Sequence, residues 1–253
     1  MHSELFSIGP ITIQSYGTMI ALGIIMALVV GMKRAGRYGL DKEKVFDLGI
    51  VCMVSGLLGA KILYVIVDFK SIMESTNALE NIAYGFVVYG GLIGGIIGVY
   101  IYCKKKKIDV LKYFDLIAPS VSIGQGFGRI GCFLAGCCYG RETDSIIGIT
   151  FTNSAFAPNG VKLLPTQLIS SAGNFAIALI LIIAARHNKT KGSILSLYLL
   201  LYGVGRFAVE FLRNDERGNV GIFSTSEFIS IFFVAAGIAM YMIARKLKAR
   251  SGV

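Results

Sequence analysis

The sequence predicts an all-α membrane protein, a polytopic bundle of about seven transmembrane helices with its N-terminus outside and its C-terminus inside the cell. The first observation is composition, because 55% of the 253 residues are apolar and the mean hydropathy is +0.69, which is too apolar for an ordinary soluble domain. The second is that glycine is abundant, at 31 residues, and proline scarce, at 4, since small residues let helices pack closely in lipid. The third is that lysine and arginine directly follow the apolar stretches.

Each predicted helix is an apolar stretch of about 20 residues, the length that crosses a hydrocarbon core of about 30 Å. These stretches occupy residues 11–32, 46–67, 84–103, 113–139, 165–185, 192–212 and 225–244. The sequence contains no low-complexity tract and no second polar domain. We therefore predict a single integral membrane domain over residues 1–253.

The basic residues predict the orientation of the helices. Segments 33–44, 104–112, 186–191 and 245–250 hold five, five, three and four lysines and arginines, which is 17 of the 25 in the chain. Cytoplasmic loops carry such an excess, so these segments are assigned to the inner side. The net charge of +10 is thereby explained, and nucleic-acid binding is not expected. The long connection at about 140–164 then faces outward, either as a short ordered loop or as a plain connector.

The sixth predicted helix carries charges inside a membrane span. Tyr202, Arg206, Glu210 and Arg213 are spaced 4, 4 and 3 residues apart, which places them on one helical face. A charge within a span is costly, so it indicates a functional site or a buried ion pair. In one interpretation, Arg206 and Glu210 neutralise each other and lock two helices together. In the other, the surplus cations Arg206 and Arg213 hold an anion such as a phosphate, whose oxygens match a planar guanidinium.

The fourth predicted helix contains a glycine-rich segment around Arg129. Gly126, Gly128 and Gly131 formally match a dinucleotide-binding fingerprint, but no strand precedes them, so close helix packing is the better interpretation. Arg129 lies 12 residues before Arg141, which would place it about 18 Å deeper along a continuous helix. A buried anion site needs such a cation.

The third predicted helix carries Tyr89, Gly90 and Gly91 near its outer end, followed by further glycines. Two interpretations are open for this segment. It is either a packing seam with an interfacial tyrosine, or the wall of a lipid pocket at which Tyr89 points its hydroxyl. Tyr16, near the outer end of the first predicted helix, is a weaker candidate of the same kind.

The cysteines do not predict a metal site. Cys132, Cys137 and Cys138 match no usual zinc spacing, and the two histidines, His2 and His187, lie far from them in the sequence. We therefore expect no metal ion and no cofactor. A catalytic thiol is not favoured either, because cysteines in apolar surroundings have a raised pKa and are usually inert.

The arginine-containing segments resemble those of bacterial prolipoprotein diacylglyceryl transferases. The specific parts are Gly128-Arg129-Ile130-Gly131 through Gly140-Arg141, and Tyr202-Gly203 with Arg206-Phe207 through Glu210-Phe211-Leu212-Arg213. The similarity covers most of the chain and includes Tyr16-Gly17, Lys61 where the family tends to have arginine, Gly90-Gly91, and Pro165-Thr166-Gln167-Leu168.

This resemblance implies a seven-helix, multi-pass enzyme of the bacterial cytoplasmic membrane. Such an enzyme moves the diacylglyceryl group of phosphatidylglycerol to the lipobox cysteine thiol of a lipoprotein precursor and releases glycerol 1-phosphate. The residues that the resemblance marks as catalytic are Arg129, Arg206 and Tyr89. Those that it marks as substrate-binding are Tyr16, Gly90, Gly91, Gly128, Arg141, Tyr202, Glu210 and Arg213. The two catalytic arginines would hold the phosphate, and Glu210 would orient them.

Besides Lys61, the sequence departs from the family after Pro165-Thr166-Gln167-Leu168, where the expected tyrosine and acid are missing, and at three further positions. Tyr89 stands where the family usually has a histidine that is cast as the base for the thiol, Cys132 stands at the usual asparagine, and Cys137 at the usual acid. A phenol is a poor base at neutral pH, so the residues support phosphate handling better than thiol activation. The alternatives are a related enzyme that serves a different acceptor and a non-enzymatic lipid binder.

Overall fold

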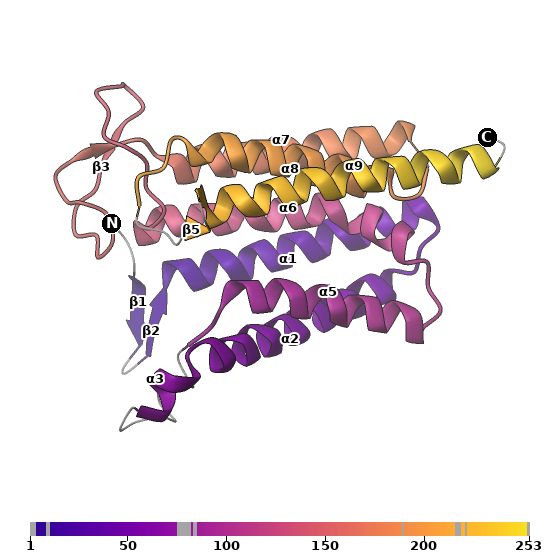
Figure 1. Ribbon diagram of the computed structural model, residues 1–253, viewed down its shortest axis with the longest axis horizontal. Coiled ribbons are helices and arrows are strands. Elements are labelled where there is room, and N and C mark those ends of the chain that lie inside the picture. Colours follow the sequence, from indigo (N-terminus) through magenta and orange to yellow (C-terminus); the bar gives the residue numbers. More distant parts are fainter. Residues whose placement is uncertain are drawn as a thin grey trace. The chain divides into compact units, whose positions relative to one another are not determined.

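The structure is a computed structural model that describes residues 4–8, 11–74, 82, 85–188, 190–215, 219–220 and 222–251. His2 lies outside these residues. Within them are seven long helices: α1 (Ser15–Ala35), α2 (Lys42–Val67), α5 (Val88–Lys105), α6 (Val110–Ala135), α7 (Thr166–His187), α8 (Ser193–Glu210) and α9 (Thr225–Ser251) (Figure 1). The short elements are η1 (Gly36–Tyr38), α3 (Phe69–Glu74), and the strands β1 (Glu4–Ile8), β2 (Ile11–Gln14), β3 (Ile149–Thr150), β4 (Lys162–Leu163), β5 (Asn219–Val220) and β6 (Phe223–Ser224). The chain is therefore mostly helical, as predicted, and each long helix matches one predicted stretch.

Among the described residues, five helical segments are long and apolar enough to cross a membrane: Ser15–Tyr38, Lys42–Val67, Thr166–His187, Ser193–Glu210 and Thr225–Ala249. Their outer faces carry large exposed apolar side chains, such as Leu57 and Ile66 on α2. An unpartnered apolar surface of this extent belongs in lipid. Helices α5 and α6 are not among these five, and they carry charges, since α5 ends in two lysines and α6 contains Arg129. The chain is thus a multi-pass membrane protein.

The first predicted helix begins later than expected. Residues 11–14 were predicted as helix, but they form β2, which pairs antiparallel with β1 from Ile8↔Ile11 to Glu4↔Gln14. The reason is local, because the sequence Ile-Thr-Ile-Gln is dominated by β-branched residues that favour a strand. Helix α1 begins directly afterwards at Ser15.

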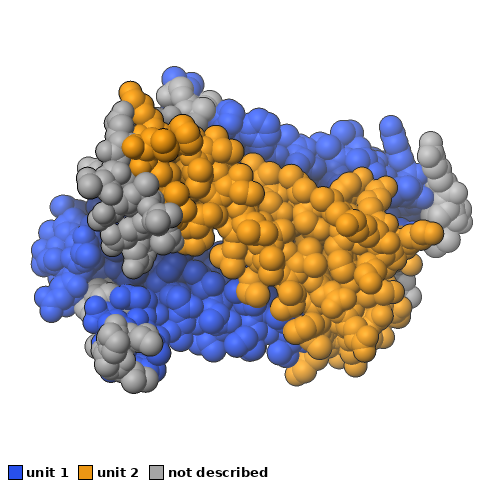
Figure 2. Space-filling model, turned by 90° about the horizontal axis from the view of Figure 1, so that it is seen from below, with its two compact units in different colours: residues 1–31, 114–253 blue, residues 32–113 orange. Residues whose placement is uncertain are grey.

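The described residues divide into two compact units, residues 1–31 with 114–253 (unit 1) and residues 32–113 (unit 2), coloured separately in Figure 2. Unit 2 is built on the contact of α2 with α5. A Cβ added to Gly59 would lie 2.3 Å from the Gly90 carbonyl oxygen and 2.9 Å from the Cα of Gly94. The two backbones therefore touch, and only glycine permits this approach. The packing-seam interpretation of the third predicted helix is confirmed.

Lys61 shows how unit 2 accommodates a cation inside α2. Its ammonium donates hydrogen bonds to the carbonyl oxygens of Ile82 and Gly85, the latter at 2.9 Å. It also lies 3.8 Å from the centre of the Phe86 ring. Backbone acceptors and an aromatic face replace the water that the ammonium would otherwise need.

In unit 1, buried hydroxyl groups join α6 to α7. Ser122 Oγ donates to the Asn174 carbonyl oxygen at 2.8 Å, and Ser171 Oγ donates to the Gly126 carbonyl oxygen at 2.9 Å. A Cβ on Gly126 would lie 2.8 Å from the Phe175 ring. The glycines of α6 thus serve helix packing, as the sequence predicted.

Asp115 of α6 fixes the start of α8. Its two carboxylate oxygens accept hydrogen bonds from the backbone N–H groups of Gly192, at 2.6 Å, and Leu195, at 2.8 Å. These donors belong to the first turn of a helix, where no backbone acceptor exists. A carboxylate there also interacts favourably with the helix dipole. Asp115 therefore sets the register of α8 against α6.

Helix α6 ends at Ala135, four residues before the predicted end at 139. Gly136 has φ +81°, and the N–H groups of Gly136 and Cys137 both donate to the Cys132 carbonyl oxygen. This is a Schellman-type helix end, which requires a left-handed residue that glycine supplies. The estimate of about 18 Å between Arg129 and Arg141 assumed a continuous helix, but the helix ends at Ala135 and the chain turns after it.

The connection at 140–164 is an ordered loop. Strands β3 and β4 pair antiparallel, with Ile149 opposite Leu163. Beneath them Phe151, Ala157 and Leu163 form a small buried core. Of the two interpretations offered for this segment, the ordered loop is confirmed.

Candidate functional site

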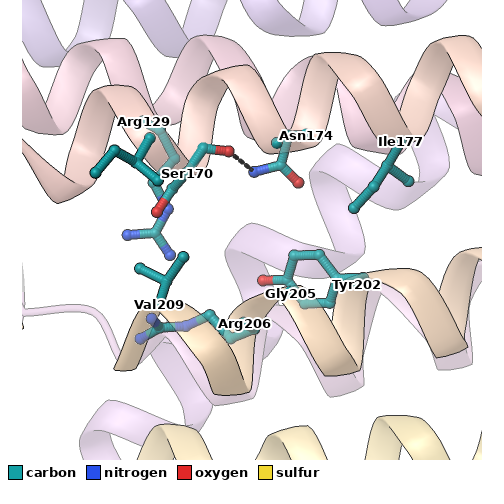
Figure 3. Close-up of a pocket in the computed structure, with 10 residues that line it drawn as sticks. Arg129, Ser170, Asn174, Ile177, Tyr202, Gly205, Arg206 and Val209 are labelled. Carbon is teal, nitrogen blue, oxygen red and sulfur yellow. Dashed lines mark hydrogen bonds between the residues drawn. The ribbon is translucent and has the colours of Figure 1, made fainter. Parts of the chain in front are cut away.

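A pocket of about 170 Å³ lies among α6, α7 and α8 in unit 1. It is lined by Arg129, Ile169, Ser170, Gly173, Asn174, Ile177, Tyr202, Gly205, Arg206 and Val209. Figure 3 shows the guanidinium groups of Arg129 and Arg206 at one end of this pocket and Ile177 at the other. The pocket is thus cationic at one end and apolar at the other, which suits an amphipathic anion.

Arg129 is the cation of this pocket that has no counter-charge. It lies on α6, half-buried, and among the described residues no carboxylate is within ion-pair distance and no acceptor takes a hydrogen bond from it. A buried guanidinium normally has such a partner, because its desolvation is costly. Its five N–H donors are therefore available to oxygen atoms that enter the pocket.

Arg206 is held in place from two sides. Its Nη1 lies 3.0 Å from Glu210 Oε2, and its Nη2 donates to Ser226 Oγ at 2.6 Å. Glu210 is 5% exposed and accepts a further hydrogen bond from Ser224 Oγ at 2.7 Å. The carboxylate thus orients Arg206 across one helical turn, as the i, i+4 spacing predicted.

Arg213 lies beyond the end of α8 and has a carboxylate of its own. Its Nε and Nη2 donate to the two oxygens of Asp215 at 2.9 and 2.6 Å, and its Nη1 lies 3.7 Å from Glu210 Oε2. Burial is the largest single influence and lowers the pKa of Arg213, but the hydrogen bonds to Asp215 and the negative charges of Cys138, Asp215 and Glu210 together raise this pKa above its ordinary value. The hypothesis that Arg213 is a surplus cation is therefore wrong, because Asp215 binds it with fork geometry.

The surplus charge lies on Arg129 instead. Three arginines, Arg129, Arg206 and Arg213, face two carboxylates, those of Glu210 and Asp215. The five groups therefore sum to +1. The ion pair of the first sequence interpretation is confirmed, since Glu210 pairs with Arg206, and the binding of an anion stays a prediction.

Sequence reasoning missed the polar side chains that α7 contributes to the pocket. Asn174 is buried, and its Nδ2 donates to the Ser170 carbonyl oxygen at 2.8 Å (Figure 3). Its Oδ1 has no hydrogen-bond donor in the described part of the chain. Ser170 and Asn174 stand four residues apart in the first half of α7, ahead of a long apolar run, so their spacing on one helical face was a usable signal.

Tyr202 forms the wall of the pocket between its two ends. Its ring stacks on Tyr198 with centroids 5.7 Å apart and packs against Phe233 at 5.3 Å. Tyr198 is in turn held by its hydroxyl, which donates to Gln125 Oε1 at 3.1 Å. Aromatic packing on both sides fixes the Tyr202 ring in the lining.

Other predicted residues lie around this site in unit 1. The backbone N–H of Arg141 donates to the Leu212 carbonyl oxygen at 3.0 Å, while the Arg141 side chain is exposed. A Cβ added to Gly128 would have no atom of the facing structure within 4 Å among the described residues. Tyr16 of α1 is 44% exposed, and its ring lies beside Gly131.

Tyr89, Gly90 and Gly91 belong to unit 2 and not to the unit that holds the pocket. Tyr89 is the second residue of α5, with its side chain 42% exposed. Gly90 and Gly91 face the backbone of α2. Their predicted roles in catalysis and substrate binding stay predictions.

The turn after α6 gathers Cys132, Cys137 and Cys138, whose sulfur atoms all lie within 4.8 Å of one another. The pKa of the Cys138 thiol is lowered, first by hydrogen bonds from the other two thiols and then by the charges of Arg213 and Arg129. The pKa of the Cys137 thiol is raised, first by its hydrogen bonds with Cys132 and Cys138, so the expectation of a raised pKa holds for Cys137 and fails for Cys138.

Comparison with known proteins decides the family. The family model described as "Prolipoprotein diacylglyceryl transferase" matches residues 3–243. The chain belongs to the prolipoprotein diacylglyceryl transferase family. Within this family it is 50% identical over 245 residues to a phosphatidylglycerol–prolipoprotein diacylglyceryl transferase of Clostridium tetani, which covers 97% of this chain and 98% of the relative.

Clostridium perfringens has two similar members of the prolipoprotein diacylglyceryl transferase family. The one named transferase 2 is 48% identical over 99% of this chain and 98% of its own length. The one named transferase 1 is 30% identical over 100% of this chain and 99% of its own length. The resemblance stated from the arginine segments is thus confirmed over almost the full chain.

Proposed function

We propose that this chain transfers the diacylglyceryl group of phosphatidylglycerol to the lipobox cysteine of a prolipoprotein and releases glycerol 1-phosphate. The observation that carries the proposal is Arg129, a half-buried cation without a counter-charge that faces Arg206 across a pocket with one apolar end. The names of the relatives supply the two substrates, phosphatidylglycerol and a prolipoprotein.

The reaction breaks a carbon–oxygen bond and forms a carbon–sulfur bond. The thiol sulfur attacks the diacylglyceryl carbon that bears the phosphate oxygen, the thiol proton leaves to a base, and the carbon–oxygen electron pair goes to the phosphate. The substrate phosphodiester carries one negative charge, and the phosphate monoester that leaves gains up to one more near neutral pH. Donors aimed at those oxygens therefore lower the barrier.

Arg129 and Arg206 are the donors placed for this task. Arg206 is oriented by Glu210 and Ser226, so little rearrangement is needed when charge develops on the phosphate. The pocket of about 170 Å³ is far larger than the ~10–15 Å³ that one water requires, and it admits a phosphate with part of its glycerol. Asn174 Oδ1 is the acceptor that we assign to a glycerol hydroxyl.

The thiol-activating half of the reaction rests on the resemblance alone. Tyr89 stands at the position of the family's usual histidine, and we keep it as the catalytic candidate for the thiol proton. Replacement of Tyr89 by phenylalanine removes only the hydroxyl. Loss of turnover in Tyr89→Phe, with phosphatidylglycerol binding unchanged, is the result expected if this hydroxyl takes part.

The same proposal includes the topology. We propose seven spans formed by α1, α2, α5, α6, α7, α8 and α9, with the N-terminus outside and the C-terminus inside a bacterial cytoplasmic membrane. These spans would form one membrane domain over residues 1–253 that binds no nucleic acid. The basic segments near residues 104 and 245 support the inner assignment. Labelling of single cysteines by a membrane-impermeant reagent in intact cells tests each loop.

The test of the activity uses purified full-length protein, phosphatidylglycerol in mixed micelles and a synthetic lipobox peptide. A peptide mass increase equal to one diacylglyceryl group, together with released glycerol 1-phosphate, is the expected result. The same peptide with serine in place of cysteine should gain no mass. Release of glycerol 1-phosphate without modified peptide would instead support a related enzyme with a different acceptor, and no turnover by folded protein would overturn the proposal.

A further inference from the structure

The turn that ends α6 assembles three thiols that the pocket does not use. Cys132 is in the last turn of α6, and Cys137 and Cys138 follow the helix. Their sulfur atoms lie within 4.8 Å of one another, and no described histidine, aspartate or glutamate belongs to the cluster. The spacing in the sequence did not predict this arrangement, because it arises only from the way the helix terminates.

The backbone of this turn is constrained in a way that fixes the three sulfur atoms. Gly136 has φ +81° and Cys138 has φ +59°. A non-glycine residue in this left-handed region is strained, so the surrounding structure has to hold it. Two almost fully buried residues of α7 do so, since Thr166 Oγ1 and Gln167 Nε2 donate to the carbonyl oxygens of Cys138 and Cys137, both at 2.7 Å.

The spacing of the sulfur atoms is close to that of a metal–thiolate site. A zinc–sulfur bond of about 2.3 Å implies sulfur–sulfur distances of about 3.8 Å in a tetrahedral site. Small rotations about the Cys side-chain bonds bring three atoms that lie within 4.8 Å to that distance. Soft sulfur ligands select thiophilic ions such as Zn²⁺ and Cu⁺, and not the hard ions Mg²⁺ and Ca²⁺.

The electrostatic surroundings also favour a thiolate site. Thiols must lose their protons to bind a metal, and three thiolates with one divalent ion carry a net charge of −1. Arg129 and Arg213 both act on the cluster electrostatically. A positive environment stabilises thiolates and offsets the negative charge that a three-thiolate complex retains.

We propose that Cys132, Cys137 and Cys138 form a binding site for one thiophilic metal ion of the Zn²⁺ or Cu⁺ class. Three thiolates supply the protein ligands, and any fourth position is open to water. This site does not depend on the transferase activity proposed above, and it revises the expectation that the chain binds no metal ion.

The test uses full-length protein in detergent, reduced with a phosphine and freed of metal by a chelator. Titration with Cd²⁺ is followed by its thiolate charge-transfer absorption, and titration with Zn²⁺ by competition with a coloured chelator. We expect one ion per chain. The double variant Cys52→Ser/Cys103→Ser, which removes the two cysteines outside the cluster, is the matched control and should bind equally.

Single variants then identify the ligands. Cys137→Ser and Cys138→Ser should each weaken binding by more than the roughly 10- to 100-fold that outer-shell changes cost. Cys132 is buried, so metal binding by Cys132→Ser is interpreted only if this variant elutes as a single species in size-exclusion chromatography.

A measurement on the unaltered chain covers the case in which variants do not fold. Cd²⁺ should protect the three cluster thiols from alkylation by a maleimide, read by peptide mass spectrometry, and leave the exposed Cys52 unprotected. No saturable binding, equal binding by the Cys137 and Cys138 variants, or protection of Cys52 alone would each overturn the proposal.

Discussion

Replacement of Arg129 by alanine is the sharpest test of the pocket. Because no described carboxylate pairs with Arg129, the change removes donors without leaving an unpaired acid behind. Loss of one preorganised donor to a developing charge costs about 10²–10³ in kcat, or ~2.7–4 kcal/mol. A guanidinium offers two parallel N–H groups to a phosphate, so we expect the upper end, a loss of ~10³. The five-charge cluster falls from +1 to neutral at the same time.

The stability of this variant should stay near that of the unaltered chain, with Tm within about 4 °C, which corresponds to ~1–2 kcal/mol for a chain of this size. The assay is the mass shift of the lipobox peptide under saturating phosphatidylglycerol, with circular dichroism for Tm. Arg245→Ala is the matched control, because Arg245 is an exposed arginine of the same unit and should keep full activity. If Arg129→Ala retains more than about a tenth of the activity, the assignment of Arg129 to the phosphate is refuted.

Further substitutions probe the parts that hold the site. Arg206→Ala should abolish turnover and also destabilise the protein by about 3–5 kcal/mol, because the buried Glu210 loses its nearest cation; an unchanged Tm would contradict this. Gly59→Leu should lower Tm by several degrees, because even a Cβ there would lie 2.3 Å from a carbonyl oxygen of the facing helix, whereas Gly17→Ala, with open space around it, should not. Asp115→Ala removes two hydrogen bonds from the first turn of α8 and should cost about 1–2 kcal/mol, measured by thermal unfolding.

The helices and one face of α8 could be predicted from the sequence because both depend on local periodicity. Apolar runs of about 20 residues located all seven long helices. The 4, 4, 3 spacing placed Arg206, Glu210 and Arg213 together, and the two ion pairs at 3.0 and 3.7 Å bear this out. Helix geometry alone fixes the Arg206–Glu210 pair, whereas Arg213 lies beyond the last residue of α8 and meets Glu210 through the turn that follows it.

The remainder of the site depends on contacts that periodicity does not encode. Asp215 binds Arg213 only because the chain turns after Glu210, where α8 ends. The cysteine cluster exists because Gly136 terminates α6, and a continuous helix to residue 139 would have pointed the three thiols in different directions. A glycine after an apolar run is a known stop signal, so this end was in part predictable, whereas the pairing of Arg213 was not.

The different environments of the two pocket arginines imply different duties. Arg206 already contacts Glu210 and Ser226, so its position is set before any substrate arrives and part of its charge is balanced. Arg129 has no such partner among the described residues, so its full charge acts on a bound phosphate. Arg129 should therefore supply most of the attraction for a phosphodiester, and most of the additional stabilisation when a second negative charge develops on the phosphate. Arg206 should mainly position the phosphate, because its own position is already fixed. The carboxylates of Glu210 and Asp215 limit the five-group cluster to one net positive charge. This charge matches the single negative charge of the phosphodiester, whereas one negative charge of the doubly charged product is left unbalanced, a condition that favours release of the product.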